Sequence, residues 1–248
     1  MSESERQIYR QRIYQNYVSS RADELAPATL AGLRPRLPYL RRLVRNYCPP
    51  DRQCSILEIG CGHGALLYAL HEAGYLNARG VDGSPQQVEA ATRLGIPGVE
   101  QGDLMEWLAA TDAASLDVVI AFDVIEHFSK SELIPLADEV RRVLKPKGRW
   151  IIHAPNAEGP FSTRIRYGDF THEQAFTRTS IDQVLRASGF AHVEVYEDRP
   201  VPHGVKSAVR AALWQCIRLV LLVCIAVETG ELDRRGVFSQ NLLAVALR

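Results

Sequence analysis

Short apolar runs alternate with segments of helical periodicity through the middle of the chain. The apolar runs predict strands at 56–59, at 78–82, at 98–103, in the first part of 116–128 and in the second part of 139–156. Helix-forming residues separate them, and this alternation is typical of a parallel sheet with helices on both faces. Ligands of such sheets bind at the carboxyl ends of the strands. We therefore look for chemistry at those ends.

The flanking segments follow other patterns. Residues 5–20 carry apolar and tyrosine side chains at helical spacing, which predicts an N-terminal helix that either packs on the core or covers a ligand. A second, arginine-rich helix is predicted at 33–46, with its basic face either solvated or in contact with an acidic substrate. The segments 191–198 and 241–247 predict the last two strands.

Residues 208–230 form a strongly apolar helical segment. Its continuous apolar run, Leu219 to Val227, is about half as long as a membrane-crossing helix requires, and Arg218 interrupts it. Three interpretations stay open: a helix packed on the sheet, a dimerisation helix through 208–227, or a helix lying on a membrane surface with Trp214 and Arg210 at the interface.

Composition narrows the function classes. The 248 residues include 29 basic and 29 acidic side chains, and this balance argues against long nucleic acid as a partner. The five cysteines have no metal-ligand spacing, and the charged start MSESERQIYRQR has no apolar leader pattern. We expect a cytoplasmic protein, with membrane association left open.

Glycines follow the first predicted strand at every second position. Gly60-Cys61-Gly62-His63-Gly64 has the spacing G-x-G-x-G, with Glu58 two residues before it. A dinucleotide-binding turn is G-x-G-x-x-G, so the spacing disfavours an NAD-dependent dehydrogenase. The segment resembles motif I of the class I S-adenosylmethionine (SAM) methyltransferases. A plain turn that closes a βα unit is the alternative.

Acidic residues follow the next two strands, and the pattern D-x-x-E-H … R-x-L-K-P-x-G follows at 123–148. The resemblance covers about 45–190 and implies a Rossmann-like, seven-stranded, mostly parallel sheet with an antiparallel last strand. It implies a helical cap at 1–48, a SAM-binding core at 49–200, and an apolar helical insertion plus the final strand at 201–248. It also implies that SAM contacts Glu58, Gly60, Cys61, Gly62, Gly64, Asp82, Gly83, Asp103, Leu104 and Phe122, with Asp82 on the ribose hydroxyls and Asp103 near adenine.

Candidate catalytic residues come after the fourth strand. Asp123, Glu126 and His127 stand at i, i+3 and i+4, which places them on one face if this segment is helical. Asp123 and Glu126 could instead form a helix cap. His172 belongs to 166–190, which resembles the stretch before a late helix in many small-molecule methyltransferases, where Thr177 or Thr179 begins the helix and His172 lies over the pocket.

Some relatives of this pattern use a divalent metal. Small-RNA 2′-O-methyltransferases and some ubiquinone-pathway O-methyltransferases carry acid-x-x-Glu-His and a later histidine. The resemblance implies that Asp123, Glu126, His127 and His172 hold an ion such as Mg²⁺ or Zn²⁺, with Asp123 shorter than the family's glutamate. Metal-free general-base catalysis by His127 or His172, with Asp123 as an acidic partner, is the alternative.

The sequence therefore predicts a SAM-dependent methyltransferase that releases S-adenosylhomocysteine. We expect a hydroxyl of a small molecule, sugar or glycan as the acceptor, and the C-terminal segment resembles bacterial enzymes associated with glycan biosynthesis. N-methylation of an amine or amino sugar, and a SAM-binding protein without catalysis, are the alternatives.

Overall fold

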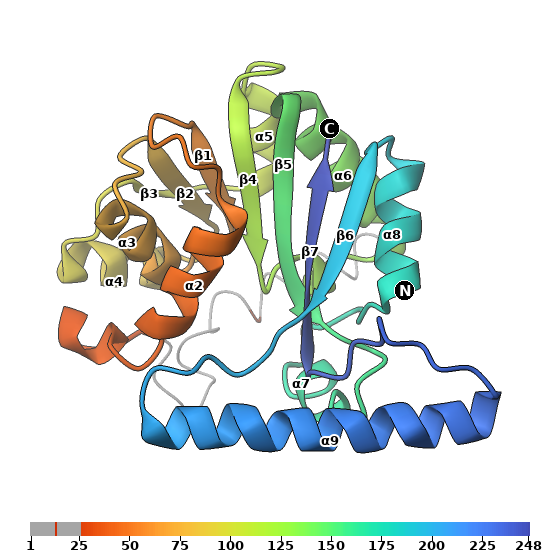
Figure 1. The fold of residues 1–248 in the computed structure, drawn as a ribbon. Coiled ribbons are helices and arrows are strands. Elements are labelled where there is room, and N and C mark those ends of the chain that lie inside the picture. Colours follow the sequence, from red (N-terminus) through yellow and green to blue (C-terminus); the bar gives the residue numbers. More distant parts are fainter. Residues whose placement is uncertain (1–12, 14–25) are drawn as a thin grey trace.

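A seven-stranded sheet forms the centre of the molecule (Figure 1). The computed structural model describes Ile13 and residues 26–248. The strand order is β3-β2-β1-β4-β5-β7-β6, and β7 is antiparallel to both of its neighbours, while the other pairs are parallel. The strands are β1 (Ile56–Ile59), β2 (Ala78–Asp82), β3 (Val99–Gln101), β4 (Leu116–Phe122), β5 (Leu144–Pro155), β6 (His192–Glu197) and β7 (Asn241–Leu247).

Helices cover both faces of the sheet. The elements are η1 (Leu30–Leu33), α2 (Leu37–Tyr47), α3 (Ala65–Glu72), α4 (Pro85–Leu94), α5 (Leu104–Ala110), η2 (Ile125–His127), α6 (Lys130–Val143), α7 (Thr163–Arg166), α8 (Arg178–Ala187) and α9 (Val205–Thr229). Helices α2 and α3 pack against each other, and α6 packs against both α5 and α8.

Buried residues alternate between the two faces along the central strands. Ile56 of β1 joins the hydrophobic cluster beneath α2 and α3, while its neighbour Leu57 joins the cluster beneath α5, α6 and α8. Because successive side chains of a strand point to opposite faces, a strand covered on both sides is apolar at most positions. The continuous apolar runs of the sequence arise from this double burial.

This architecture confirms the predicted fold class, including the reversed last strand and the apolar C-terminal helix. The second predicted helix is also present, although it begins at Leu37 and a short 3-10 turn precedes it. The predicted helix at 5–20 lies outside the described residues, apart from Ile13. The proposed division of the chain at 48 and 200 stays a prediction.

The segment after β4 differs from its prediction. A single 3-10 turn, η2, stands where a helix was expected, and Asp123 has a left-handed φ of 55°. Asp123, Glu126 and His127 therefore do not share an α-helical face. The cap interpretation is also wrong: α6 begins at Lys130, and Ser129 with Glu132 forms its capping box.

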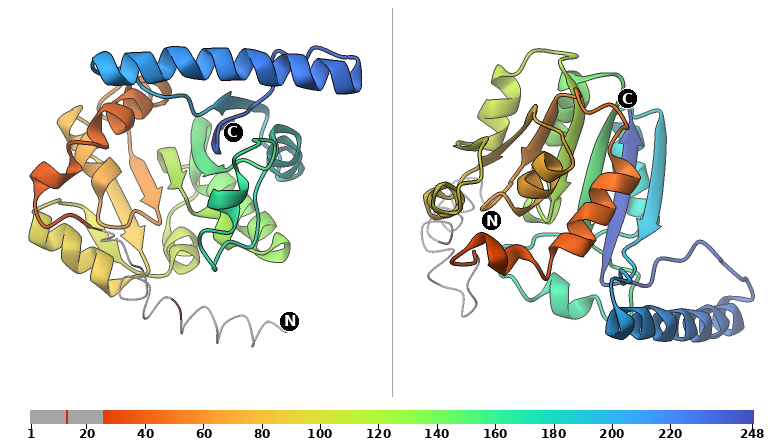
Figure 2. Two further views of the ribbon diagram at one scale, coloured as in Figure 1. Left: turned by 90° about the horizontal axis from the view of Figure 1, so that it is seen from below. Right: turned by 60° about the vertical axis from the view of Figure 1, so that its left-hand side comes forward.

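Helix α9 lies outside the layered body (Figure 1). It runs across the lower end of the sheet, the end at which β4 terminates, and the views in Figure 2 place it against an outer side of the molecule. Ser207 and Leu222 are its buried residues. The interpretation of this segment as a helix packed on a sheet face does not hold.

Candidate active site

The glycine turn joins β1 to α3 through a left-handed backbone. Gly60, Gly62 and Gly64 have φ values of 66°, 55° and 78°, a region that side chains disfavour. A Cβ at Gly60 would lie 2.5 Å from Cγ2 of Val124, so the absent side chain lets the turn pack directly on the segment that follows β4. The predicted cofactor turn and the predicted catalytic segment are thus neighbours. Cys61, in the middle of the turn, is buried.

Asp82 faces the glycine turn from the end of β2. Its Oδ2 accepts a hydrogen bond from the Gly62 N–H at 2.8 Å, and its Oδ1 accepts one from the Ser84 N–H at 2.8 Å. Burial raises the pKa of this carboxyl, while the two N–H donors oppose the rise. Each carboxylate oxygen has more than one lone pair. Asp82 therefore orders the turn and keeps acceptor capacity for ribose hydroxyls.

Asp103 is placed differently. It lies two residues beyond β3, is exposed, and its Oδ1 accepts hydrogen bonds from the N–H groups of Met105 and Glu106 as the N-cap of α5. Leu104, the first residue of α5, is half-buried, and Gly83 stands directly after Asp82. The structure gives Asp103 a capping role, and its contact with adenine stays a prediction.

Glu58 is a buried acid beneath the turn. Its side chain is 3% exposed, and within the described part of the chain its Oε2 has no hydrogen-bond partner. Burial and the neighbouring charge of Asp82 raise its pKa well above the usual value, while the guanidinium of Arg36 opposes the rise. Arg36 also acts on the pKa of His63 and of Asp123, so its charge reaches both sides of the turn. The sequence argument treated Arg36 as part of a basic stretch.

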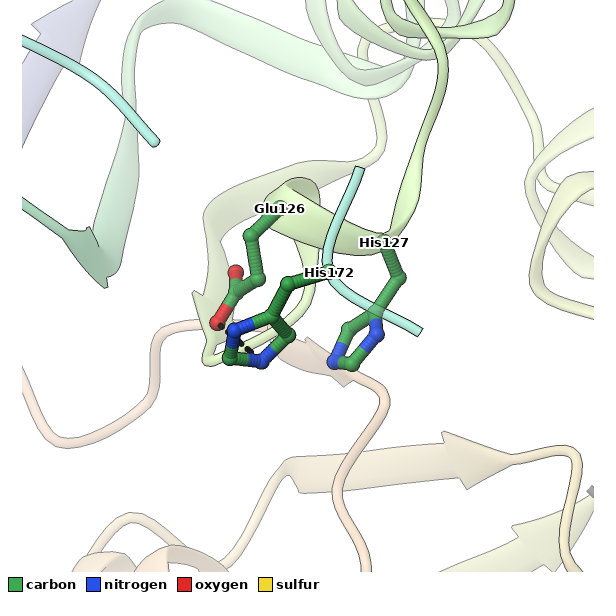
Figure 3. Close-up of side chains that lie close together, drawn as sticks. All are labelled: Glu126, His127 and His172. Carbon is green, nitrogen blue, oxygen red and sulfur yellow. Dashed lines mark ion pairs between the residues drawn. The ribbon is translucent and has the colours of Figure 1, made fainter. Parts of the chain in front are cut away.

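Glu126, His127 and His172 form a cluster at the carboxyl end of β4 (Figure 3). One ligand atom from each lies within 4.8 Å of the others, and Nε2 of His172 is 3.9 Å from Oε1 of Glu126. Glu126 is 1% exposed, and among the described residues its Oε2 has no hydrogen-bond partner. A buried carboxylate oxygen without a donor is costly unless a cation or proton reaches it.

The hydrogen bonds around the two histidines define their tautomers. Thr171 donates its hydroxyl proton to Asp169 at 2.6 Å, so its oxygen accepts from Nδ1 of His127 at 2.8 Å. Nδ1 of His172 donates to the Ile165 carbonyl at 3.0 Å. Both rings therefore carry their proton on Nδ1, and Nε2 is the nitrogen with a lone pair. Histidines that bind metals are held in the same way by their other ring nitrogen.

Burial disfavours the charged forms of all three members of the cluster. Burial lowers the pKa of His127 to about 4, with the neighbouring His172 as a second cause, and burial also lowers the pKa of His172. Burial and the charge of Asp123 raise the pKa of Glu126 well above its usual value. Neutral imidazoles are the form that binds a metal or accepts a proton.

Asp123, expected as a fourth ligand, is engaged elsewhere. Its Oδ1 lies 2.6 Å from Nδ1 of His153 in β5, and Nε2 of the same ring lies 3.4 Å from Oδ2 of Asp198. Burial alone would lower the pKa of His153, but the two carboxylates raise it to about 10. Desolvation raises the pKa of Asp123, and the charge and hydrogen bond of His153 outweigh it and hold that pKa below its usual value.

Phe122 and Tyr39 complete the surroundings of His153. The Phe122 ring is stacked on His153 with centroids 4.2 Å apart, and Tyr39 from α2 meets both rings edge-on. Sequence reasoning missed His153, Asp198 and Tyr39. A polar residue inside the apolar run of β5 was the available indication for His153.

Comparison with known proteins places this geometry in context. A family model described as a methyltransferase domain matches residues 17–195. The chain is similar to the Synechocystis 2-methyl-6-phytyl-1,4-hydroquinone methyltransferase, with 28% identity over 64% of this chain and 49% of the relative. It is also similar to mouse EEF1A lysine methyltransferase 4, with 29% identity over 60% of each chain. The chain thus spans about half to three fifths of these relatives.

Among solved structures, a SAM-dependent methyltransferase from Archaeoglobus fulgidus has the same fold. The TM-score is 0.63 at 22% identity, with 86% of this chain and 94% of the other covered. At this identity the likeness concerns the arrangement of helices and strands alone.

Proposed function

We propose that this protein methylates a hydroxyl group. The premise is that the chain belongs to the methyltransferase-domain family and is a SAM-dependent methyltransferase. The acceptor would be a small molecule, sugar or glycan, and Glu126, His127 and His172 would position it. The observation that carries the proposal is the buried carboxylate facing two histidines whose Nε2 atoms lack protons.

The cofactor side of the proposal rests on the turn. Asp82 is hydrogen-bonded to the Gly62 N–H and lies at the end of β2, where a carboxylate meets the ribose of a bound nucleoside in folds of this type. The turn itself consists of Gly60, Cys61, Gly62 and Gly64, with Glu58 before it and Gly83 after Asp82. Asp103 and Leu104 follow β3, and Phe122 ends β4. The contact of Gly60 with Val124 brings this turn beside the cluster.

The chemistry needs a proton acceptor close to the methyl donor. The acceptor oxygen forms a bond to the methyl carbon, the carbon–sulfur bond breaks, S-adenosylhomocysteine leaves, and the hydroxyl proton must go to a base. The unprotonated Nε2 of His172 or His127 can take it. Holding the hydroxyl in line with the methyl group contributes much of the rate enhancement.

The same three residues fit a divalent cation. Glu126 has an unpartnered oxygen among the described residues, and both histidines are oriented through Nδ1. A bound ion such as Zn²⁺ or Mg²⁺ would lower the pKa of a coordinated hydroxyl. Three protein ligands would leave positions open for neighbouring acceptor hydroxyls. Asp123, paired with His153, is not needed in this set.

N-methylation is the second candidate. The similarity to a relative named as a lysine methyltransferase supports an amine acceptor. The similarity to a relative named for a hydroquinone supports an acceptor that carries hydroxyl groups. An amine needs a base but gains nothing from a cation site, so the effect of metal on turnover separates the two.

The test compares two variants by SAM titration calorimetry and by release of S-adenosylhomocysteine over a panel of sugars, catechols and amines. We expect Asp82→Ala to weaken SAM binding at least tenfold, because the turn loses two hydrogen bonds and the ribose loses its acceptor. We expect His172→Ala to bind SAM normally and to lose at least tenfold in turnover. Full turnover by His172→Ala would remove the cluster from catalysis.

A metal titration tests the cation site without requiring turnover. We expect Zn²⁺ or Mn²⁺ to bind wild-type protein in calorimetry and to bind Glu126→Gln at least tenfold more weakly. The exposed Glu100→Gln in β3 is the matched control and should bind like wild type. Equal affinity for wild type and Glu126→Gln, together with turnover that is resistant to EDTA, would leave the metal-free base.

A further inference from the structure

The outward side of α9 is apolar along most of its length. By length and composition this helix is long and apolar enough to cross a membrane, with a mean hydropathy of 1.9 over an 18-residue window of which 6% is buried. Leu219, Val220 and Val223 are 63%, 60% and 53% exposed. Large, contiguous patches of exposed apolar side chains mark interaction surfaces in soluble proteins.

The charged side chain in the middle of α9 points toward the protein. Between 211 and 227 the charged residue is Arg218, whose side chain is 14% exposed and whose Nε lies 3.0 Å from the carboxylate of Glu197. Arg218 also donates to the Arg234 carbonyl at 2.8 Å. The middle of the helix thus presents its charge to the protein and its aliphatic side chains to the surroundings, the reverse of a water-facing helix. Lys206 and Arg210 near its start and Glu228 near its end are exposed.

A second exposed segment lies at the same end of the molecule. Helix α7 also lies at the lower end of the sheet in Figure 1, and the views in Figure 2 show it set apart from α9. Flanking α7, Phe161 and Tyr167 are 51% and 75% exposed, next to the exposed Arg164. Aromatic and basic side chains together are typical of the membrane–water interface. The loop that follows α7 carries His172 of the cluster.

We propose that α9 lies flat on a lipid bilayer and turns the carboxyl edge of the sheet toward the membrane. The helix is 25 residues long and therefore presents a strip of roughly 37 Å. Lys206 and Arg210 extend from its first turns toward lipid phosphates. Resting on the proposed function, this placement makes the acceptor a hydroxyl carried by a lipid.

A lipid surface fits these observations better than a second copy of the chain. The apolar strip on α9 and the aromatic residues around α7 come from separate segments at one end of the molecule, and a bilayer is broad enough to contact both. Arg218 fixes the orientation, because a spanning arrangement would draw it away from Glu197 and leave that buried acid with one cation fewer.

The experiment is vesicle sedimentation of the full chain with phosphatidylglycerol–phosphatidylethanolamine vesicles. We expect wild-type protein to pellet and Val220→Glu/Val223→Glu to lose about tenfold in partitioning for each valine replaced. Both side chains are exposed, so the variant should keep its Tm and its affinity for SAM. Leu76→Glu is the matched control, since Leu76 is 78% exposed and precedes β2 at the opposite edge of the sheet.

Three outcomes would overturn the proposal. Equal sedimentation of wild type and the double variant would remove α9 from binding. A vesicle-independent dimer that the double variant abolishes would identify a second copy as the occupant. Protein that resists alkaline carbonate extraction would show a spanning helix. Because SAM affinity is measured separately, loss of vesicle binding with intact SAM binding leaves the proposed reaction standing.

Discussion

At position 153 an imidazole stands between two carboxylates inside the apolar run of β5. Asp123 and Asp198 raise the pKa of His153 to about 10, against a burial effect in the other direction. Both acids contact the protonated ring. These two contacts connect the ends of β4 and β6 through His153 of β5. This arrangement stabilises the wall of the site beside Phe122.

The raised pKa predicts a pH-dependent stability. A group whose folded pKa lies above its unfolded value contributes fully below the unfolded pKa, near 6.5, and loses that contribution as the pH passes its folded pKa, near 10. We expect wild-type Tm to fall by at least ~5 °C between pH 6.5 and 10, and His153→Gln to show a lower, flatter curve. The exposed His203→Gln should follow wild type. Parallel curves for wild type and His153→Gln, from thermal circular dichroism, would refute this pairing.

Some site residues could be predicted from the sequence and others could not. Asp82 and the glycines are local features, since a strand end and a turn carry them together. His153 and Asp198 are 45 positions apart and meet because β6 runs in the same direction as β5, across the antiparallel β7, so that both strands end at the same end of the sheet. The spacing of residues in a sequence motif does not predict that contact. Asp123 looked like a ligand by motif, and its left-handed backbone directs it to His153 instead.

At the scale of elements, the start of α6 controls where the site segment ends. Ser129 and Glu132 form a capping box, and Glu132 accepts from the Ser129 N–H at 2.7 Å. The chain therefore leaves η2 and enters α6 at Lys130, four residues after Glu126. A helix beginning at Asp123 would have placed its acids and histidine on one face, as the sequence suggested.

This cap predicts a moderate loss of stability. We expect Ser129→Ala to lower the free energy of unfolding by ~1 kcal/mol and Tm by roughly 2–4 °C. Lys130→Ala, at the exposed first position of the same helix, should have little effect. Urea unfolding monitored by circular dichroism measures both, and an unchanged Ser129→Ala midpoint would show that the cap contributes nothing.

The type of each element could be predicted from hydrophobic periodicity, but the position of each element in the fold could not. The strands β1 and β2 begin and end close to the predicted residues because double burial makes each apolar position visible. The apolar pattern at 208–230 predicted a helix but not what the helix contacts, because hydropathy does not indicate which face of a helix is covered. In the structure its outward positions are exposed.

Over the whole molecule, one edge of the sheet combines the cofactor turn, the cluster and the exposed apolar helix. We expect hydrogen exchange of α9 amides at Leu213–Val223 to slow at least tenfold when lipid vesicles are added, since water then reaches the helix less often. Amides of β1 and β4 should exchange equally with and without vesicles. Equal exchange of α9 in both conditions would argue against the membrane arrangement.

The position of β7 has a consequence for how the chain matures. This strand follows α9 in the chain, yet it lies between β5 and β6. During translation the ribosome releases β6 and the apolar helix α9 before β7, the strand that connects β6 to the rest of the sheet. Until β7 emerges, β5 lacks its antiparallel neighbour, so α9 is synthesised before the sheet beside which it lies is complete.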